Sequence, residues 1–206
     1  MELHEAMAQI SEIRLRLAQT ETFRGYRSVT VAGTGSVAFA AGALQLVFLP
    51  EPMSDTTTYL ALWIGAAVLA AAGTGMEMLF RSRRTTDPMA ASLTRLAVEQ
   101  FLPCVMAGGM LTATIALCCP ESVALLPGLW QVLFALGIFS SCRLLPRPTA
   151  WAAGFYLVCG VASLSIARGP LALSPWAMAL PFGIGQWIWA AILYWTLERE
   201  HGRLEH

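Results

Sequence analysis

The sequence predicts an all-α membrane protein, a bundle of six transmembrane helices with an amphipathic cytoplasmic helix at the N-terminus. Three observations predict this class. The composition is 56% hydrophobic and 13% charged, with a mean hydropathy of +0.59, whereas soluble domains carry about 25% charged residues. The apolar residues gather in blocks of the length that a helix needs to cross a hydrocarbon core of about 30 Å. The basic residues lie almost entirely on one side of these blocks.

Residues 1–27 form the predicted amphipathic helix. Leu3, Met7, Ile10 and Ile13 recur at helical spacing, and charged residues occupy the other positions. Acidic residues match the basic ones here, whereas a helix that lies on a lipid surface is rich in Lys and Arg. We expect this helix to pack on the cytoplasmic side of the bundle or on a second copy. Docking of a partner protein is the alternative.

Six apolar runs follow, joined by short connections that carry turn residues such as Pro50-Glu51-Pro52 and Gly169-Pro170. An amphipathic extension from Pro88 precedes the third run. Residues 204–206 resemble the start of an affinity tag and are excluded from the fold. The predicted transmembrane domain covers 28–203, with runs at about 29–49, 57–80, 101–119, 123–142, 150–167 and 175–197.

Arginine placement predicts the orientation. The chain has no lysine, and twelve of its thirteen arginines precede the first run, follow the sixth, or lie between runs two and three or four and five. The segments on the opposite side contain only Arg168. Because basic loops stay in the cytoplasm, we expect both termini there. Interfacial anchors are expected near the run ends, at Trp63, Trp151, Trp176, Tyr194 and Trp195.

Motifs that carry chemistry are missing from the sequence. It contains no G-x-S-x-G elbow, no H-E-x-x-H and no P-loop. The histidines fall outside the apolar runs, so a haem or an intramembrane metal site would lack imidazole ligands; they are His4, His201 and His206. We therefore expect no catalytic residue, cofactor, metal or nucleic-acid partner, and no enzyme.

Three charged residues on the cytoplasmic side are candidates for a site. Glu77 lies about one turn before the end of the second run, and Glu99 follows Arg95 by four residues, so that the two can pair on one helix face. Intramembrane ionisable groups usually indicate function. One interpretation is a proton or cation site; the other is a pair of interfacial carboxylates neutralised by nearby arginines. An enzyme acting on a lipid-phase substrate would also need these carboxylates.

A second candidate set is uncharged and lies in the middle or outer parts of the runs. Pro127 and Pro181 each free a backbone carbonyl at comparable depth. If these groups converge, they line a small polar pocket open to the outside. The alternative is ordinary hydrogen bonding between helices, worth about 0.6 kcal/mol per pair. The pocket candidates are Gln45, Thr112, Thr114, Trp130, Gln131, Gln186 and Trp187.

Small residues spaced four apart predict close helix contacts and suggest a homodimer through such faces. The pairs are Ala38 with Gly42, Ala71 with Gly75, and Gly109 with Ala113. The cysteines do not form a disulfide framework, and we expect free thiols. They are Cys104, Cys118, Cys119, Cys142 and Cys159.

Several proline-containing motifs carry a resemblance to a known group. They are Leu126-Pro-Gly-Leu-Trp130, Leu145-Pro-Arg-Pro148, Ser174-Pro-Trp-Ala-Met178 and Pro181-Phe-Gly-Ile-Gly-Gln186, with Glu12-Ile-Arg14 leading to Phe23 near the N-terminus. On these motifs, most of the chain resembles a family of small uncharacterised bacterial six-helix inner-membrane proteins. The resemblance implies a multi-pass protein of the bacterial cytoplasmic membrane. The resemblance does not identify any functional residue in this chain.

Two functions remain. The absence of catalytic groups favours non-catalytic binding of a small ligand, a lipid or a protein partner by an integral membrane protein that self-associates. The alternative is a small transporter or channel that uses the outward-facing polar pocket and the two glutamates. Such a carrier normally needs a charged residue at mid-depth, and the runs contain none there.

Overall fold

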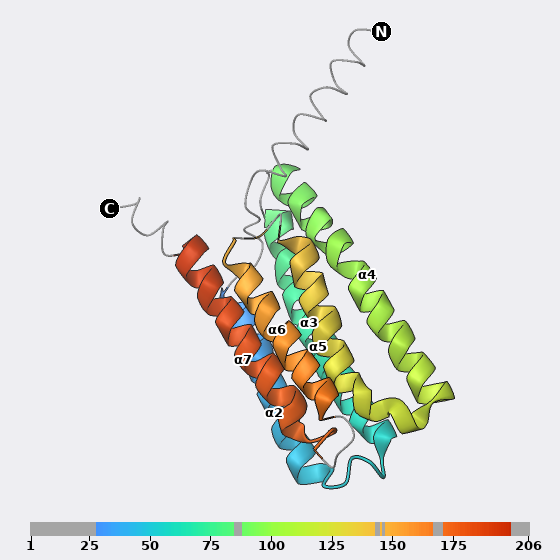
Figure 1. Ribbon diagram of the computed structural model, residues 1–206. Helices are drawn as coiled ribbons and strands as arrows, with labels where there is room; N and C mark the ends of the chain where they lie inside the picture. The colour runs from blue at the N-terminus through green and yellow to red at the C-terminus, as the bar shows by residue number, and fades with distance from the viewer. Residues whose placement is uncertain (1–27, 85–87, 143–144, 146, 167–170, 199–206) are drawn as a thin grey trace, which may run out of the picture.

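The computed structural model describes residues 28–84, 88–142, 145, 147–166 and 171–198, and Figure 1 shows their helices lying side by side as a bundle. Within these residues the secondary structure is helical, as predicted. The elements are α2 (Ser28–Phe48), α3 (Thr56–Arg84), α4 (Pro88–Cys118), the 3-10 helix η1 (Pro120–Leu125), α5 (Leu126–Ser141), α6 (Thr149–Ser165), α7 (Pro175–Leu193) and the π-helix η2 (Tyr194–Glu198).

Five of these helical segments are long and apolar enough to cross a membrane: Ser28–Phe48, Thr56–Phe80, Val98–Cys118, Pro120–Ser141 and Pro175–Thr196. The chain is therefore a helical bundle of the multi-pass membrane type. The fifth predicted run forms α6, which has 17 residues and a length of about 25 Å at 1.5 Å per residue. Because this is shorter than a hydrocarbon core of about 30 Å, six spans stay a prediction. The predicted N-terminal helix and residues 204–206 lie outside the described residues.

The two ends of the bundle differ in charge. At one end, α3 ends at Arg84, Arg95 lies in the N-terminal part of α4, and Arg147 lies just before α6. We call this the arginine end. The connections at the opposite, acidic end carry Glu51, Asp55 and Glu121.

Glycines set which helices pack most closely. A Cβ atom built at Gly35 of α2 would lie 2.9 Å from the carbonyl oxygen of Gly183 in α7, and one at Gly42 would lie 2.6 Å from Cβ of Ala179. At these distances any side chain larger than a hydrogen atom would clash. The backbones of α2 and α7 are therefore in contact. The predicted close packing at Ala38 and Gly42 is confirmed, because both are buried on this face.

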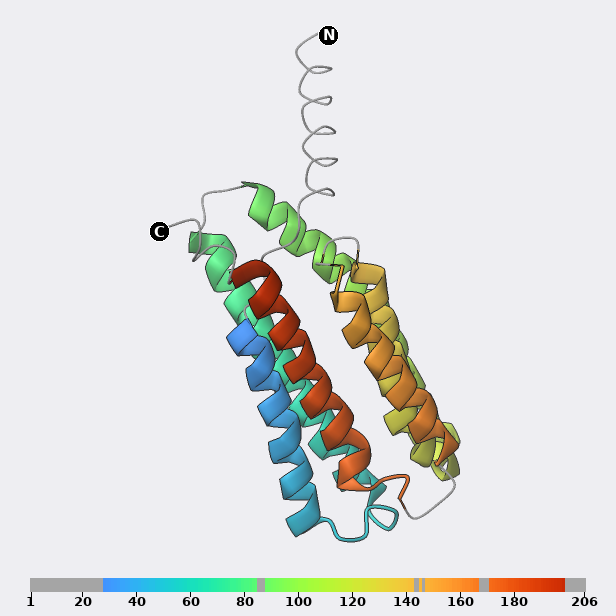
Figure 2. The same ribbon diagram turned by 60° about the vertical axis from the view of Figure 1, so that its left-hand side comes forward.

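The helices α5 and α6 form a second pair of the same kind. A Cβ atom at Gly128 would lie 2.8 Å from the carbonyl oxygen of Gly160, and one at Gly160 would lie 3.0 Å from that of Gly128. Figure 2 shows α2, α3 and α7 on one side of the bundle and α4, α5 and α6 on the other. Each side is thus a glycine-packed pair with one further helix.

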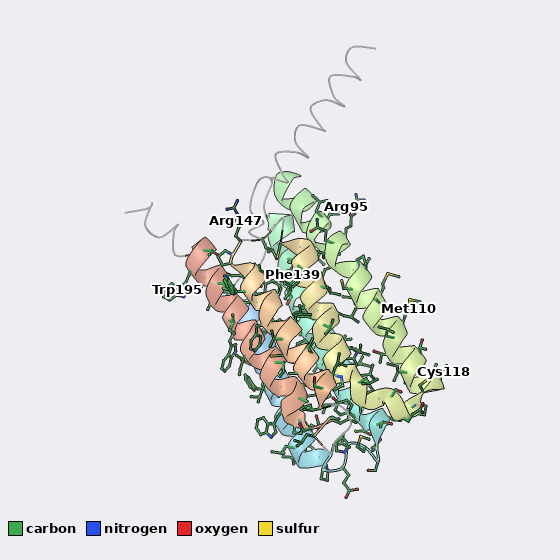
Figure 3. All side chains as sticks on the ribbon, in the orientation of Figure 1. Arg95, Met110, Cys118, Phe139, Arg147 and Trp195 are labelled. Atoms are coloured by element: carbon green, nitrogen blue, oxygen red, sulfur yellow. The ribbon has the colours of Figure 1, made fainter. Side chains whose placement is uncertain are left out.

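The further helices, α3 and α4, are little covered. Of their apolar windows, 11% is buried in α3 and 6% in α4, against 56% in α7. Figure 3 shows Arg95, Met110 and Cys118 projecting from α4 away from the bundle. The small pairs Ala71–Gly75 and Gly109–Ala113 lie on these helices, and a Cβ atom at either glycine would meet nothing within 4 Å. Among the described residues, the glycines of these two pairs therefore make no close helix contact.

The buried side chains form two clusters, one toward each end. The cluster at the arginine end contains Tyr156 and Trp189, and the cluster at the acidic end contains Tyr59 and Trp63. Phe182 packs against both. Trp151, Trp176 and Trp195 are exposed near helix ends, as interfacial anchors are. Trp63 was expected among them, but the structure buries it to 3% exposure, because its indole N–H has a partner inside the bundle.

Candidate functional site

Gln45 of α2 links three segments at the acidic end. Its Nε2 donates to the carbonyl oxygen of Leu173 at 2.7 Å, and its Oε1 accepts from Nε1 of Trp63 in α3 at 2.8 Å. Gln45 is fully buried. Because apolar surroundings cannot hydrogen-bond to an amide, both partners are needed to hold the group there. Gln45 therefore fixes α2 to α3 and to the segment before α7.

Gln131 of α5 links its helix to α6 and α7 by hydrogen bonds, as Gln45 links α2 to its neighbours. Its Nε2 donates to the carbonyl oxygen of Ala177 at 2.8 Å, and its Oε1 accepts from the hydroxyl of Ser163 in α6 at 3.3 Å. Pro181 follows Ala177 by four residues and has no N–H, so the Ala177 carbonyl lacks its helical donor. The buried amide of Gln131 supplies that donor. The freed carbonyl expected from Pro181 is thus occupied.

Trp130 and Thr112 meet between α4 and α5. Nε1 of Trp130 donates to Oγ1 of Thr112 at 2.8 Å, and that hydroxyl donates to the carbonyl oxygen of Gly108 at 2.7 Å. Thr114 is exposed on the same helix. The structure therefore brings two of the predicted pocket residues together and directs the third outward.

The last two pocket candidates are neighbours in α7 with different surroundings. Gln186 is buried, whereas Trp187 is about half exposed. The indole N–H of Trp187 donates to the carbonyl oxygen of Ala32 in α2 at 3.2 Å, and its ring lies 4.9 Å from that of Phe39, between centroids. Convergence of all seven candidates on one outward-facing pocket stays a prediction.

Two residues were missed by sequence reasoning as parts of these contacts. The sequence predicts an interfacial position for Trp63 and gives no sign of a role for Ser163. Of these contacts, only the Ala177 carbonyl could be predicted from the sequence, because Pro181, four residues later, has no N–H to donate to it. Tyr59 is a further case, because its buried hydroxyl has no hydrogen-bond partner within the described chain.

The charged candidates differ in burial. The hydroxyl of Thr30 in α2 donates to Oε2 of Glu77 in α3, and Glu77 is half-buried. Nε of Arg95 lies 2.6 Å from Oε1 of Glu99, the predicted pair along one helix face, and both side chains are exposed. The hydrogen bond and charge of Glu99 raise the pKa of Arg95. Glu77 and Glu99 are thus held by different partners on different helices.

Groups that could hold a metal or react as nucleophiles are sparse in the described chain. It contains no cluster of three or more His, Cys, Asp or Glu side chains placed to bind a metal ion. All five cysteines are free, and Cys118 is exposed at the acidic end.

Comparison with known proteins found no relative of this chain. No family model, curated protein or solved structure matches the chain.

Proposed function

We propose that this chain is a six-span protein of the bacterial cytoplasmic membrane, with both termini in the cytoplasm, that acts without catalysis by binding a partner in the plane of the bilayer. Among the ligand, lipid and protein partners that the sequence leaves open, we propose a protein, a second copy of the chain. The charge difference between the two ends supports the orientation, because the arginine end belongs on the cytoplasmic side.

One observation carries the proposal of a partner. The helices α3 and α4 leave their apolar faces uncovered, and those faces present glycines where lipid-facing helices usually present bulky residues. A Cβ atom at Gly65, Gly73, Gly75 or Gly109 would meet nothing within 4 Å. Small residues let two helix backbones approach closely, which is how helices associate within a membrane.

The hydrogen bonding of the glutamines favours binding over transport. Gln45 and Gln131 are fully buried, and each of their amide groups both donates and accepts inside helix contacts. A transported solute needs polar groups that can exchange one partner for another. Amides held by backbone carbonyls and by neighbouring side chains serve the fold instead.

The test is the oligomeric state of the full chain in lipid nanodiscs, measured by counting fluorophore bleaching steps. We expect two copies for the wild type at low protein density. Gly75→Leu and Gly109→Leu place bulky side chains on the proposed faces and should give single copies. Gly33→Leu is the matched control, because Gly33 is exposed on α2 and also has nothing within 4 Å of its Cβ position. A wild-type protein that stays single would overturn the proposal.

A further inference from the structure

One face of α4 is exposed from the arginine end almost to the acidic end. Seven exposed residues of this helix fall within about 80° of one another around the helix axis, at 3.6 residues per turn. We call this face the α4 seam. Its residues are Arg95, Glu99, Leu102, Met106, Gly109, Ala113 and Leu117.

The middle of the α4 seam carries little side-chain bulk. Gly109 and Ala113 lie one helical turn apart, and a Cβ atom at Gly109 would meet nothing within 4 Å. Met106 and Leu117, which are larger, lie on the two sides of these small residues along the seam. Two helix backbones can approach closely where residues are small, while larger neighbours pack around the contact. This part of the seam suits another helix.

The charges at the arginine end of the seam indicate which helix that is. Nε of Arg95 donates to Oε1 of Glu99 at 2.6 Å, and the two side chains are 80% and 51% exposed. A guanidinium carries five N–H donors, and within the described residues this one makes no other hydrogen bond. Its terminal nitrogens are therefore free to bind a second carboxylate. Glu99 beside them disfavours an anionic lipid headgroup, whereas a parallel copy of the same seam offers an opposite charge to both residues.

The helix α4 also continues past the apolar span at this end. It begins at Pro88 and its apolar window begins at Val98, so about 15 Å of helix, at 1.5 Å per residue, precedes the span. Figure 1 shows these first turns lying beyond the ends of α5 and α7. Helices of this length are marginal in water without a packing neighbour. A second α4 alongside would supply one.

From these observations we infer that the second copy docks along the α4 seam, with the two α4 helices parallel at the two-fold axis of the dimer. Both copies have the same orientation in the membrane, so equivalent residues meet at the same depth. Gly109 and Ala113 form the close contact, and Arg95 of each copy lies beside Glu99 of the other. The helix α3 neighbours α4 in the bundle, so its glycines border the same contact. This inference rests on the proposed self-association and names the surface that makes it.

Charge reversal tests the contact between copies. Arg95→Glu makes both seam charges negative, and Glu99→Arg makes both positive. Each variant alone should pair with itself more weakly than the wild type, by roughly fivefold to thirtyfold. When the two variants carry fluorophores of different colours and are reconstituted together in nanodiscs, mixed pairs should exceed the random proportion.

Mixing separates the contact between copies from the ion pair within one helix, because each variant has lost that ion pair and mixing does not restore it. A chain that carries both Arg95→Glu and Glu99→Arg should again pair with itself. Arg147→Glu is the matched control, since Arg147 is exposed at the same end but lies outside the α4 seam. It should pair as the wild type does.

Distances between copies locate the interface without changing the seam. One spin label per chain is attached through an unnatural keto side chain, which leaves the native cysteines in place, at an exposed valine: Val105 of α4, Val68 of α3 or Val158 of α6. Electron paramagnetic resonance of the full chain in nanodiscs then gives the distance between the two copies. We expect the shortest distance at Val105, beside the seam, and the longest at Val158, which α5 separates from α4.

Single copies for the wild type would overturn the self-association and this inference together. Two copies with the shortest distance at Val68 or Val158 would overturn the α4 seam and leave self-association standing. Reversed-charge variants that show no preference for each other would do the same. Should a charge variant not fold, the three distances in the otherwise unchanged chain are sufficient to accept or reject the seam.

Discussion

The indole N–H of Trp63 and the amide oxygen of Gln45 lie 2.8 Å apart, with both side chains buried. This bond connects two helices that are consecutive in the chain and antiparallel in the bundle. The opposite side of the same amide holds the Leu173 carbonyl. Within a membrane, no water competes for these groups, so a tryptophan that could have faced the lipid surface is drawn inside.

Trp63→Phe tests this contact. Phenylalanine fills most of the same volume but leaves the Gln45 oxygen without a donor, which costs about 1–3 kcal/mol for a buried group. We expect a lower midpoint of thermal unfolding in detergent, followed by tryptophan fluorescence and by gel filtration. Trp151→Phe is the control, because Trp151 is exposed. Equal midpoints for the two variants would show that the Trp63 hydrogen bond does not stabilise the fold.

Two glycines of α6 should respond in opposite ways to alanine. A Cβ atom at Gly160 would lie 3.0 Å from the carbonyl oxygen of Gly128, whereas one at Gly154 would meet nothing within 4 Å. Gly160→Ala should therefore destabilise the protein by about 1–3 kcal/mol through overpacking. Gly154→Ala should leave it unchanged or stabilise it by up to about 1 kcal/mol, because alanine is the better helix former. Chemical denaturation in mixed micelles measures both, and a tolerated Gly160→Ala would argue against the α5·α6 contact.

Asp55 gives the fold a dependence on pH. Its Oδ1 accepts from the backbone N–H of Thr58 at 3.0 Å at the start of α3. The side-chain hydrogen bond with Thr58, followed by the backbone one, lowers the pKa of Asp55 from 3.8. Because the pKa is lower in the folded state, the stabilisation is present above 3.8 and is lost as the pH falls through the folded value.

We therefore expect Asp55→Ala to unfold at a lower temperature than the wild type at neutral pH, with the difference shrinking below pH 3.8. Asp55→Asn should remain close to the wild type at neutral pH, since asparagine is also a good N-cap. Thermal unfolding across pH measures the three proteins. A difference between wild type and Asp55→Ala that grows on acidification would contradict the cap.

Glu77 and Glu99 should differ in what their removal does to the fold. Glu77→Leu leaves the Thr30 hydroxyl without its acceptor inside the bundle, whereas Glu99→Leu removes an exposed partner of Arg95. We expect a lower unfolding midpoint for Glu77→Leu and an unchanged one for Glu99→Leu, because exposed ion pairs add little stability. Glu77→Gln should restore stability. Solute flux into liposomes that is lost in the well-folded Glu77→Gln would favour the transporter alternative.

The sequence was sufficient to predict the helices, because blocks of about twenty apolar residues have no other way to satisfy their peptide groups in lipid. It was not sufficient to predict which faces pack. Ala38–Gly42 and Ala71–Gly75 have the same spacing, yet the glycine of the first pair packs against α7, whereas a Cβ atom at the glycine of the second would meet nothing within 4 Å. Both faces of such helices are apolar, so the choice depends on the shape of the neighbouring helix.

For the candidate site as well, the sequence indicates which residues matter but not which partners they contact. The sequence predicts that polar residues inside apolar runs either line a pocket or bond between helices, and the structure gives Gln45 and Gln131 hydrogen-bond partners between helices. The acceptors are backbone carbonyls, which every residue carries, so the sequence could not single out Leu173. Ala177 was the exception, because Pro181 marks a carbonyl that lacks its helical donor.

The number of crossings decides whether the proposed membrane protein is correctly described, and the short helix α6 is where the count could change. Alkaline phosphatase, which is active only outside the cytoplasm, can be fused after Arg203 and, separately, after Glu121. Six spans predict an inactive fusion after Arg203 and an active one after Glu121. Activity after both residues would mean an odd number of crossings, activity after Arg203 alone would mean an inverted orientation, and either result would contradict six spans with both termini in the cytoplasm.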